Sequence, residues 1–182
     1  EEKVLPTYTG EGQVIRGWSA GCSSGEEAYT LAIILDCFFQ DKEIDFKVLA
    51  TDVNSEVLDY AKKAIYPSER VANIPNHLLK NYFLLGTGEN QGFFKVKNEL
   101  RNNLVFGKVN LNQDNYPIKS KFDFIFCRNV FIYFDQKSRE KILDKFYDCL
   151  KKDGYLFLGH ADGVKIKSNK WRQVWKTTFV KQ

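Results

Sequence analysis

The sequence is short of cysteine, histidine and long apolar runs, and these shortages exclude several classes of protein. It has 4 Cys and 2 His among 182 residues, and no two cysteines form a C-x-x-C pair. A zinc site needs closely spaced Cys or His ligands, so no metal site is predicted. No apolar run approaches the roughly 20 residues of a transmembrane helix. The first residues also lack the charged-then-apolar pattern of a signal peptide.

Charge of one sign is not concentrated anywhere in the sequence. Charged residues make up 27% of the chain and the formal net charge is +4. Lys and Arg are scattered, which argues against a nucleic-acid partner. Free cysteines on apolar segments suit a reducing compartment. We therefore expect a cytoplasmic monomer without membrane insertion, and the start without Met suggests an excised fragment, a tag scar or processing.

Strand and helix patterns alternate along most of the chain. Strands are predicted at Val14–Ala20, Phe46–Thr51, Phe122–Cys127 and Tyr155–Gly159, and helices at Glu26–Phe39, Ser55–Ala64, Pro75–Leu85 and Gln136–Leu150. Ser55 is a possible N-cap of its helix. Such alternation predicts an α/β fold with a doubly wound, mostly parallel sheet.

The middle and the two ends of the chain depart from this alternation. Phe93–Lys97 and Leu104–Val109 look like paired strands, so residues 86–109 are predicted to form a small antiparallel β insertion, its last strand possibly returning to the main sheet. Residues 1–13 contain Pro6, Gly10 and Gly12 and are interpreted as a lead-in to one domain at 14–182. Closing strands are expected around Trp171, Trp175 and Phe179.

The first strand is followed by the loop A-G-C-S-S-G and then by Glu26 and Glu27. Two glycines alone indicate no more than a tight strand-to-helix turn. The glutamates would repel a pyrophosphate at the helix N-terminus, which disfavours NAD, FAD and ATP. S-adenosylmethionine (SAM) carries a sulfonium and an ammonium group and no phosphate, so acidic residues suit it. Alternatively, both glutamates simply complement the helix dipole.

Asp52 directly follows the second predicted strand. In doubly wound folds an acidic residue at this place accepts hydrogen bonds from a ribose diol. The alternative is a helix-capping Asp ahead of Ser55. Given the first loop, the ribose interpretation is favoured.

Four strings in order carry a family resemblance: W-S-A-G-C-S-S-G-E-E-A-Y-T, A-T-D-V-N-S-E-V-L, F-C-R-N-V-F-I-Y-F and the G-H at Gly159 and His160. Together they resemble the chemotaxis receptor methyltransferases, the CheR family, from about Val4 to about Val164. The resemblance implies a class I SAM-dependent methyltransferase fold and methyl esterification of glutamate side chains on the cytoplasmic domain of chemoreceptors. It implies receptor docking by residues 86–109. The cofactor contacts it implies are Ala20, Gly21, Glu27, Asp52, Asn110, Leu111, Arg128 and Asn129, with Asn110 and Leu111 on the adenine side.

Three departures from the family pattern bear on activity. The family's helical N-terminal domain and its N-x-T-x-F-F-R string are not among these residues, so a cofactor-binding and docking module without turnover stays open. The family's G-H-S-E is G-H-A-D at Gly159–Asp162, and the loop G-T-G-E-N-Q-G lacks an adjacent Arg that some members use to hold a receptor tail peptide. An RNA or small-molecule methyltransferase is disfavoured because no basic stripe is present.

Methyl transfer to a glutamate needs no general base, because a carboxyl of pKa about 4.3 is already ionised at neutral pH. Arg128 follows an apolar strand at the edge where ligands bind in such sheets, and its planar fork can orient a carboxylate. Tyr133 could hydrogen-bond the same substrate. We therefore predict Arg128 and Tyr133 as catalytic residues. The alternatives are a surface ion pair for Arg128 and a core aromatic for Tyr133.

Overall fold

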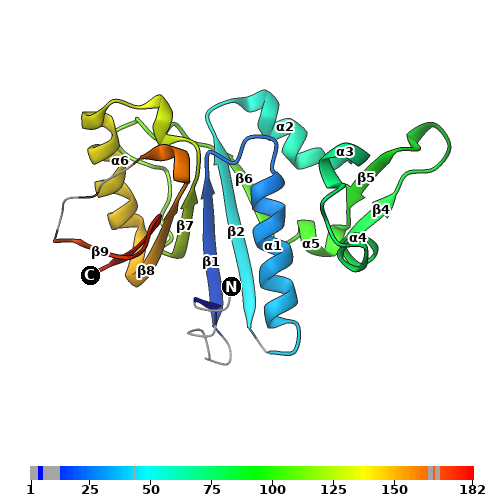
Figure 1. Cartoon of the computed structure of the whole chain (residues 1–182), viewed down its shortest axis with the longest axis horizontal. Coiled ribbons are helices and arrows are strands. Elements are labelled where there is room, and N and C mark those ends of the chain that lie inside the picture. Colours follow the sequence, from blue (N-terminus) through cyan, green and yellow to red (C-terminus); the bar gives the residue numbers. More distant parts are fainter. Residues whose placement is uncertain (1–3, 6–12, 43, 164–165, 167–168) are drawn as a thin grey trace.

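The computed structural model describes residues 4–5, 13–42, 44–163, 166 and 169–182. The described residues form a seven-stranded and a three-stranded sheet. The strands of the larger sheet are β1 Val14–Ala20, β2 Asp45–Asp52, β6 Leu104–Lys108, β7 Phe122–Cys127, β8 Leu150–Leu158, β9 Trp171–Trp175 and β10 Thr178–Lys181 (Figure 1). Their order is β6-β2-β1-β7-β8-β10-β9. The first five strands in this order run parallel, and β10 and β9 are antiparallel to their neighbours.

Three longer helices pack on the larger sheet: α1 Glu26–Phe39, α2 Ser55–Lys63 and α6 Gln136–Cys149. Neighbouring residues of β7 belong to different cores, since Phe124 packs with α1 residues and Ile125 packs with α6 residues. Successive strand side chains point to opposite faces of a sheet. Helices therefore cover both faces, and the predicted doubly wound, mostly parallel α/β fold is confirmed. None of the described helices is both long enough and apolar enough to cross a membrane.

The order in which successive strands are added to the sheet reverses at β1. From β1 the chain proceeds through β2 to β6 at one edge and then returns to β7 on the other side of β1. Ligands of open α/β sheets bind at such a switch point, beyond the carboxyl ends of the strands. The edge formed by Ala20, Asp52 and Cys127 is therefore where a site is expected.

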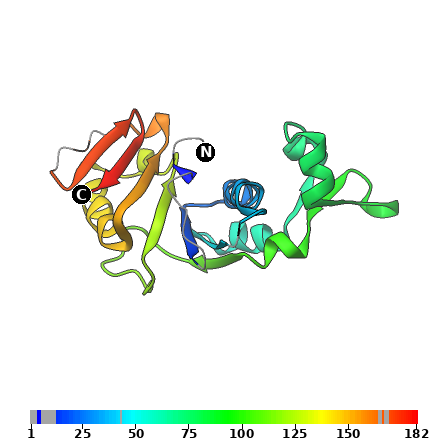
Figure 2. The same cartoon turned by 90° about the horizontal axis from the view of Figure 1, so that it is seen from below.

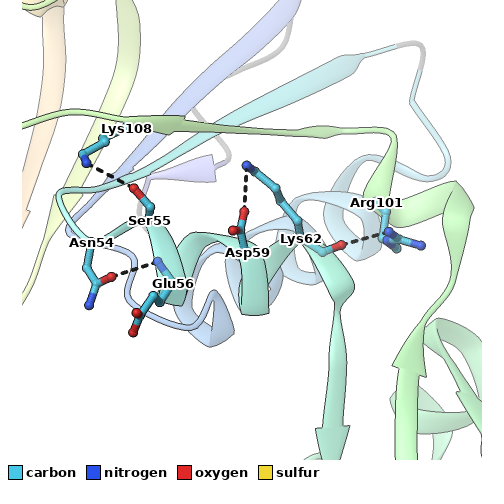
Figure 3. Close-up of polar contacts among 7 residues, drawn as sticks. All are labelled: Asn54, Ser55, Glu56, Asp59, Lys62, Arg101 and Lys108. Carbon is cyan, nitrogen blue, oxygen red and sulfur yellow. Dashed lines mark hydrogen bonds and ion pairs between the residues drawn. The ribbon is translucent and has the colours of Figure 1, made fainter.

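Helix α2 begins differently from the prediction. Its N-cap is Asn54, whose extended backbone lets Oδ1 accept a hydrogen bond from the Glu56 N–H at 2.8 Å. Ser55, the predicted N-cap, already lies in the helix, and its Oγ accepts from Lys108 Nζ at 3.1 Å (Figure 3). The prediction was wrong because two adjacent residues, Asn and Ser, both have capping side chains and only the backbone decides between them.

The smaller sheet lies apart from the larger one, at the right of Figure 1, where β4 and β5 are labelled, and at the right of Figure 2. It contains β3 Ile65–Pro67, β4 Phe83–Leu85 and β5 Phe93–Val96, in the antiparallel order β3-β5-β4. The short helices around it are α3 Ser68–Val71, α4 Asn76–Tyr82 and α5 Asn98–Arg101, and a 3-10 turn covers Gly88–Asn90.

The predicted pairing of Phe93–Lys97 with Leu104–Val109 is wrong. β5 pairs with β3 and β4, whereas β6 pairs in parallel with β2 in the larger sheet, so the expected possibility that the last strand returns to the main sheet is confirmed. The intervening helix α5 carries the chain from one sheet to the other, and Asn103 at its end accepts the Val48 N–H at 2.8 Å. Residues 86–109 therefore hold strands of both sheets, and the small sheet begins at Ile65, before that range.

The two ends of the domain compare unevenly with the prediction. The closing strands are confirmed, since β9 contains Trp171 and Trp175 and β10 contains Phe179. β8 starts at Leu150, earlier than predicted, and Tyr155 lies after a register shift within it. Pro6, Gly10 and Gly12 lie outside the described residues, so the boundary between 1–13 and 14–182 stays a prediction.

Candidate functional site

A pocket of about 610 Å³ opens at the carboxyl ends of β1, β2 and β7. Its lining residues are Gly21, Cys22, Ser23, Glu26, Glu27, Asp52, Val53, Val109, Asn110, Leu111, Arg128, Asn129, Val130, Tyr133 and Phe134. The pocket thus lies at the switch point of the sheet. It brings together eight of the nine site residues predicted from the sequence.

The turn after β1 is fixed against its neighbours. The N–H groups of Gly21 and Cys22 both donate to the Thr51 carbonyl oxygen at 2.8 Å. Gly21 has a φ of +84°, and a Cβ there would lie 2.5 Å from Val130 Cγ2. Glycine is needed at this position because the turn after β1 passes so close to the loop after β7.

Glu27 places a carboxylate inside the pocket. Ser19 donates from Oγ to Glu27 Oε1 at 2.7 Å, and Arg128 Nη1 lies 3.9 Å from Glu27 Oε2. Burial raises the pKa of Glu27, while the Ser19 hydrogen bond and the Arg128 charge oppose that rise. A partly buried carboxylate of this kind attracts a cation, because little water screens it.

Glu26 lies at the rim of the same pocket and has different partners. Its carboxylate pairs with Arg70 from α3 and accepts a hydrogen bond from Ser24 Oγ at 2.6 Å. The two glutamates therefore differ, since Glu26 is tied to the small-sheet side of the molecule and Glu27 faces Arg128.

Asp52 joins two turns at the pocket wall. Its Oδ2 accepts from the Ser23 N–H at 2.9 Å, and its Oδ1 accepts from the Asn54 N–H at 3.0 Å. The alternative of a helix-capping Asp52 fails in its simple form, because the α2 N-cap is Asn54. The carboxylate lines the pocket and is placed to meet a polar ligand group there.

Asn110 and Leu111 follow β6 and form the wall beside Asp52. The Val109 N–H donates to the Asp52 carbonyl oxygen at 3.1 Å, which joins the two segments. Asn110 Oδ1 accepts from the Asn112 N–H at 2.9 Å. Leu111 is 6% exposed and gives the wall an apolar surface, as a flat aromatic ring would require.

Arg128, Asn129 and Tyr133 lie on the loop after β7. The Arg128 side chain is 50% exposed, and its ion pair with Glu27 at 3.9 Å joins two residues that line the pocket. Tyr133 is 80% exposed, so the alternative of a core aromatic is wrong. Phe131, two residues earlier, is 0% exposed and packs in the core. Asn129 has a left-handed backbone with a φ of 57° and lines the pocket.

Ala20 is the predicted residue that is not among those lining this pocket. It ends β1 and is fully buried. Sequence reasoning missed Ser19, which binds Glu27, and the lining residues Cys22, Ser23, Val53, Val109, Val130 and Phe134. All of them except Ser23 directly neighbour a predicted site residue, and this adjacency is the signal that could have found them. Burial raises the pKa of Cys22 to about 12, so this thiol stays protonated.

Two chemotaxis protein methyltransferases are similar to this chain in sequence. The chain is 42% identical over 174 residues to a protein named chemotaxis protein methyltransferase from Borreliella burgdorferi, over 92% of this chain and 60% of the relative. It is 42% identical over 147 residues to the protein of that name from Escherichia coli, over 81% of this chain and 51% of the relative. The chain thus spans between 51% and 60% of the length of these two relatives.

The chain is also similar to a methyltransferase of known structure and to a family model. A TehB-like SAM-dependent methyltransferase from Corynebacterium glutamicum superimposes with a TM-score of 0.53 at 15% identity, over 98% of this chain and 83% of that chain. At this identity the likeness shows the fold alone. Residues 1–180 match the family model described as CheR methyltransferase, SAM binding domain. Because that match covers nearly the whole sequence, the chain belongs to the CheR family of methyltransferase SAM-binding domains.

Proposed function

We propose that the chain binds SAM in the pocket at the switch point and methylates glutamate side chains of chemoreceptors. One observation carries the proposal: within a CheR-family domain, a single pocket presents the carboxylates of Glu27 and Asp52 together with the guanidinium of Arg128. The carboxylates suit a cationic cofactor bearing a diol. The guanidinium suits an anionic acceptor.

The proposed cofactor contacts divide by chemistry. Glu27 attracts the positively charged part of SAM, and Asp52 accepts hydrogen bonds from the ribose hydroxyls. Asn110 and Leu111 hold the adenine side, where a polar edge meets an apolar wall. Gly21 and Asn129 contribute backbone close to the ligand, and the fully buried Ala20 supports the turn from below.

Orientation is the main task left to the protein. When bound, SAM supplies a methyl group whose C–S bond breaks as a carboxylate oxygen attacks, leaving the bonding electron pair on sulfur. No proton moves, so no general base is needed. Arg128 holds one oxygen of the acceptor carboxylate while the other stays free to attack. The exposed Tyr133 donates a hydrogen bond to the same acceptor. Alignment of two reactants can contribute about 7–11 kcal/mol at best.

The proposed partner is the cytoplasmic domain of a chemoreceptor. The protein is proposed to bind it in the cytoplasm as a monomer. Exposed apolar side chains of the small sheet support docking on that side, with Leu85 65% and Phe93 44% exposed. Phe93 lies within the proposed docking range 86–109, and Leu85 lies just before it.

The direct test incubates the chain with tritiated SAM and membranes that contain a chemoreceptor. Methyl esters of glutamate are alkali-labile, so we expect tritium on the receptor that base releases. A receptor whose acceptor glutamates are replaced by alanine should take up none. Tight binding of S-adenosylhomocysteine without any such label would instead favour the docking module without turnover.

Glu27→Gln is expected to weaken SAM binding at pH 7 by about 10-fold to 100-fold. The reason is loss of a charged acceptor, worth about 1.5–3 kcal/mol, with about 1.4 kcal/mol per factor of ten. Because burial raises the pKa of Glu27, wild-type affinity should decline as pH falls and this carboxyl becomes protonated. The variant should show no such decline. Calorimetric titration between pH 5 and pH 8 measures both effects, with the exposed Glu56→Gln on α2 as control (Figure 3).

The same substitution should have the opposite effect on the ligand-free fold. A carboxyl with a raised folded-state pKa contributes stability that is present below its unfolded pKa and lost as pH rises through its folded pKa. Once the Glu27 carboxyl is ionised that contribution is gone, and Gln then removes the cost of burying the charge. Glu27→Gln should therefore raise the melting temperature at pH 7 while weakening SAM binding. A lower melting temperature together with unchanged affinity would remove Glu27 from the site.

A further inference from the structure

The loop after β7 is held by a carboxylate from another part of the chain. Asp162 lies in the 3-10 turn His160–Asp162 beyond β8 and is 2% exposed. Its Oδ2 accepts from the Gly159 N–H at 2.6 Å and from the Asn129 N–H at 3.0 Å. Its Oδ1 accepts from the Phe131 N–H at 3.0 Å. Three backbone donors therefore converge on one buried side chain.

The loop needs this support because its backbone is irregular. Asn129 has a left-handed backbone, and the 3-10 turn Phe131–Tyr133 follows after Val130. Neither strand nor helix pairing serves the Asn129 and Phe131 N–H groups, and a buried donor without a partner is costly. Gly159 makes the approach possible, since a Cβ there would lie 2.6 Å from Asn129 Oδ1 and 2.8 Å from Asn129 N.

A cation holds the other side of the same loop. Arg139 of α6 donates from Nε to the carbonyl oxygens of Phe131 at 3.0 Å and Phe134 at 2.8 Å. Asp162 thus takes N–H groups of the loop and Arg139 takes its carbonyl groups. The backbone between Arg128 and Phe134 is fixed from both sides, and Arg128 and Tyr133 extend from it into the pocket.

We infer that Asp162 is a positioning residue for methyl transfer, which acts by holding the backbone that carries Arg128 and Tyr133. The inference rests on the proposed function of these two side chains. Asp162 itself is not among the described residues that line the pocket, so it acts through the loop and not on the cofactor.

The test is Asp162→Asn, which keeps the shape of the side chain and replaces one acceptor oxygen by an N–H donor. One loop N–H group, that of Asn129 or that of Phe131, then faces a donor, and the loop must move. We expect kcat for receptor methylation to fall about 100-fold, because a displacement near 1 Å at a reacting group can cost that much. Affinity for S-adenosylhomocysteine should fall by less than about tenfold, since Glu27, Asp52 and Asn110 lie on other elements.

Two further variants separate positioning from stability. Asp162→Glu keeps the carboxylate and should retain most of the transfer. Asp123→Asn is the matched control, because Asp123 is also buried at 7% and also accepts a backbone N–H, from Arg16 at 2.8 Å. It lies on β7 away from the pocket, so it should lower stability without a selective loss of kcat. Hydrogen exchange at the Asn129 and Phe131 amides reports the loop directly and should accelerate in Asp162→Asn alone.

The outcomes distinguish this inference from the proposed function. A kcat of Asp162→Asn within threefold of the wild type, or a loss that Asp123→Asn matches, would overturn the positioning role. If the wild-type chain transfers no methyl group at all, the proposed function fails first. Amide exchange then decides the inference: faster exchange of both amides upholds it, and unchanged exchange overturns it.

Discussion

Arg128→Ala is expected to reduce methyl transfer to a chemoreceptor by at least about 100-fold, since loss of orientation alone can cost that much. Affinity for S-adenosylhomocysteine should change far less, because the main role proposed for Arg128 is to hold the acceptor. A variant that lowers transfer without matching loss of cofactor affinity has lost an interaction with the acceptor or the transition state. Single-turnover rates with saturating SAM, together with calorimetric titration, measure the two quantities.

Arg70→Ala is the matched control for this experiment. Arg70 also pairs with a glutamate of α1, and its side chain is 56% exposed against 50% for Arg128. It is not among the described residues lining the pocket, so its loss should leave transfer within about threefold of the wild type. Equal losses of transfer and of cofactor affinity in Arg128→Ala would make Arg128 a cofactor residue. Equal losses of transfer in both variants would mean that general charge and not orientation is responsible.

Asp52→Ala is expected to lower affinity for S-adenosylhomocysteine by about 100-fold to 10,000-fold. The variant removes a charged acceptor for two ribose hydroxyls, each bond worth about 1.5–3 kcal/mol, and about 1.4 kcal/mol corresponds to a factor of ten. It also removes the acceptor of the Ser23 and Asn54 N–H groups, which loosens the turn after β1. Calorimetry measures the affinity, and thermal unfolding checks that the fold persists.

Asp59→Ala provides the control on the same segment. Asp59 is an exposed carboxylate of α2 whose partner is Lys62 at 3.4 Å (Figure 3). It lies outside the pocket, so we expect wild-type affinity. An Asp52→Ala chain that is folded and binds S-adenosylhomocysteine as tightly as Asp59→Ala does would remove Asp52 from the site.

The regular part of the fold could be predicted from local signals. The predicted bounds of strand Val14–Ala20, helix Glu26–Phe39 and strand Phe122–Cys127 agree with the structure. In each case an apolar pattern is closed by a strong marker: glycines after the first strand, two glutamates at the helix start, and Arg128 after the third segment. Such markers set the ends of an element when periodicity alone leaves them open.

The pairing partners of β5 and β6 could not be predicted in the same way. Two strands separated by a short segment usually form a hairpin, and local reasoning therefore paired Phe93–Lys97 with Leu104–Val109. The structure places the four-residue helix α5 between them and pairs β6 with β2, 56 residues earlier in the chain. That choice depends on tertiary contacts, because β6 completes the parallel edge of the larger sheet.

The site residues also differ in how far the sequence could predict them. Asp52 and Arg128 at strand ends, and Glu27 in the first turn of the helix after β1, could be predicted because parallel strands bring their carboxyl ends to one edge. Asp162 could not be assigned a role, since its contact with Asn129 spans 33 residues and depends on the approach of Gly159. Ala20 was predicted by its position in a string, and burial of its side chain was visible only in the structure.

The location of S-adenosylhomocysteine in a crystal structure of its complex tests the account most directly. We predict density for the ligand in the pocket at the switch point, with the ribose hydroxyls at Asp52, the amino group toward Glu27, and adenine beside Asn110 and Leu111. Arg128 should turn from Glu27 toward the open side of the pocket, where the acceptor enters. Ligand density elsewhere on the chain, or in this pocket with its ribose away from Asp52, would contradict the account.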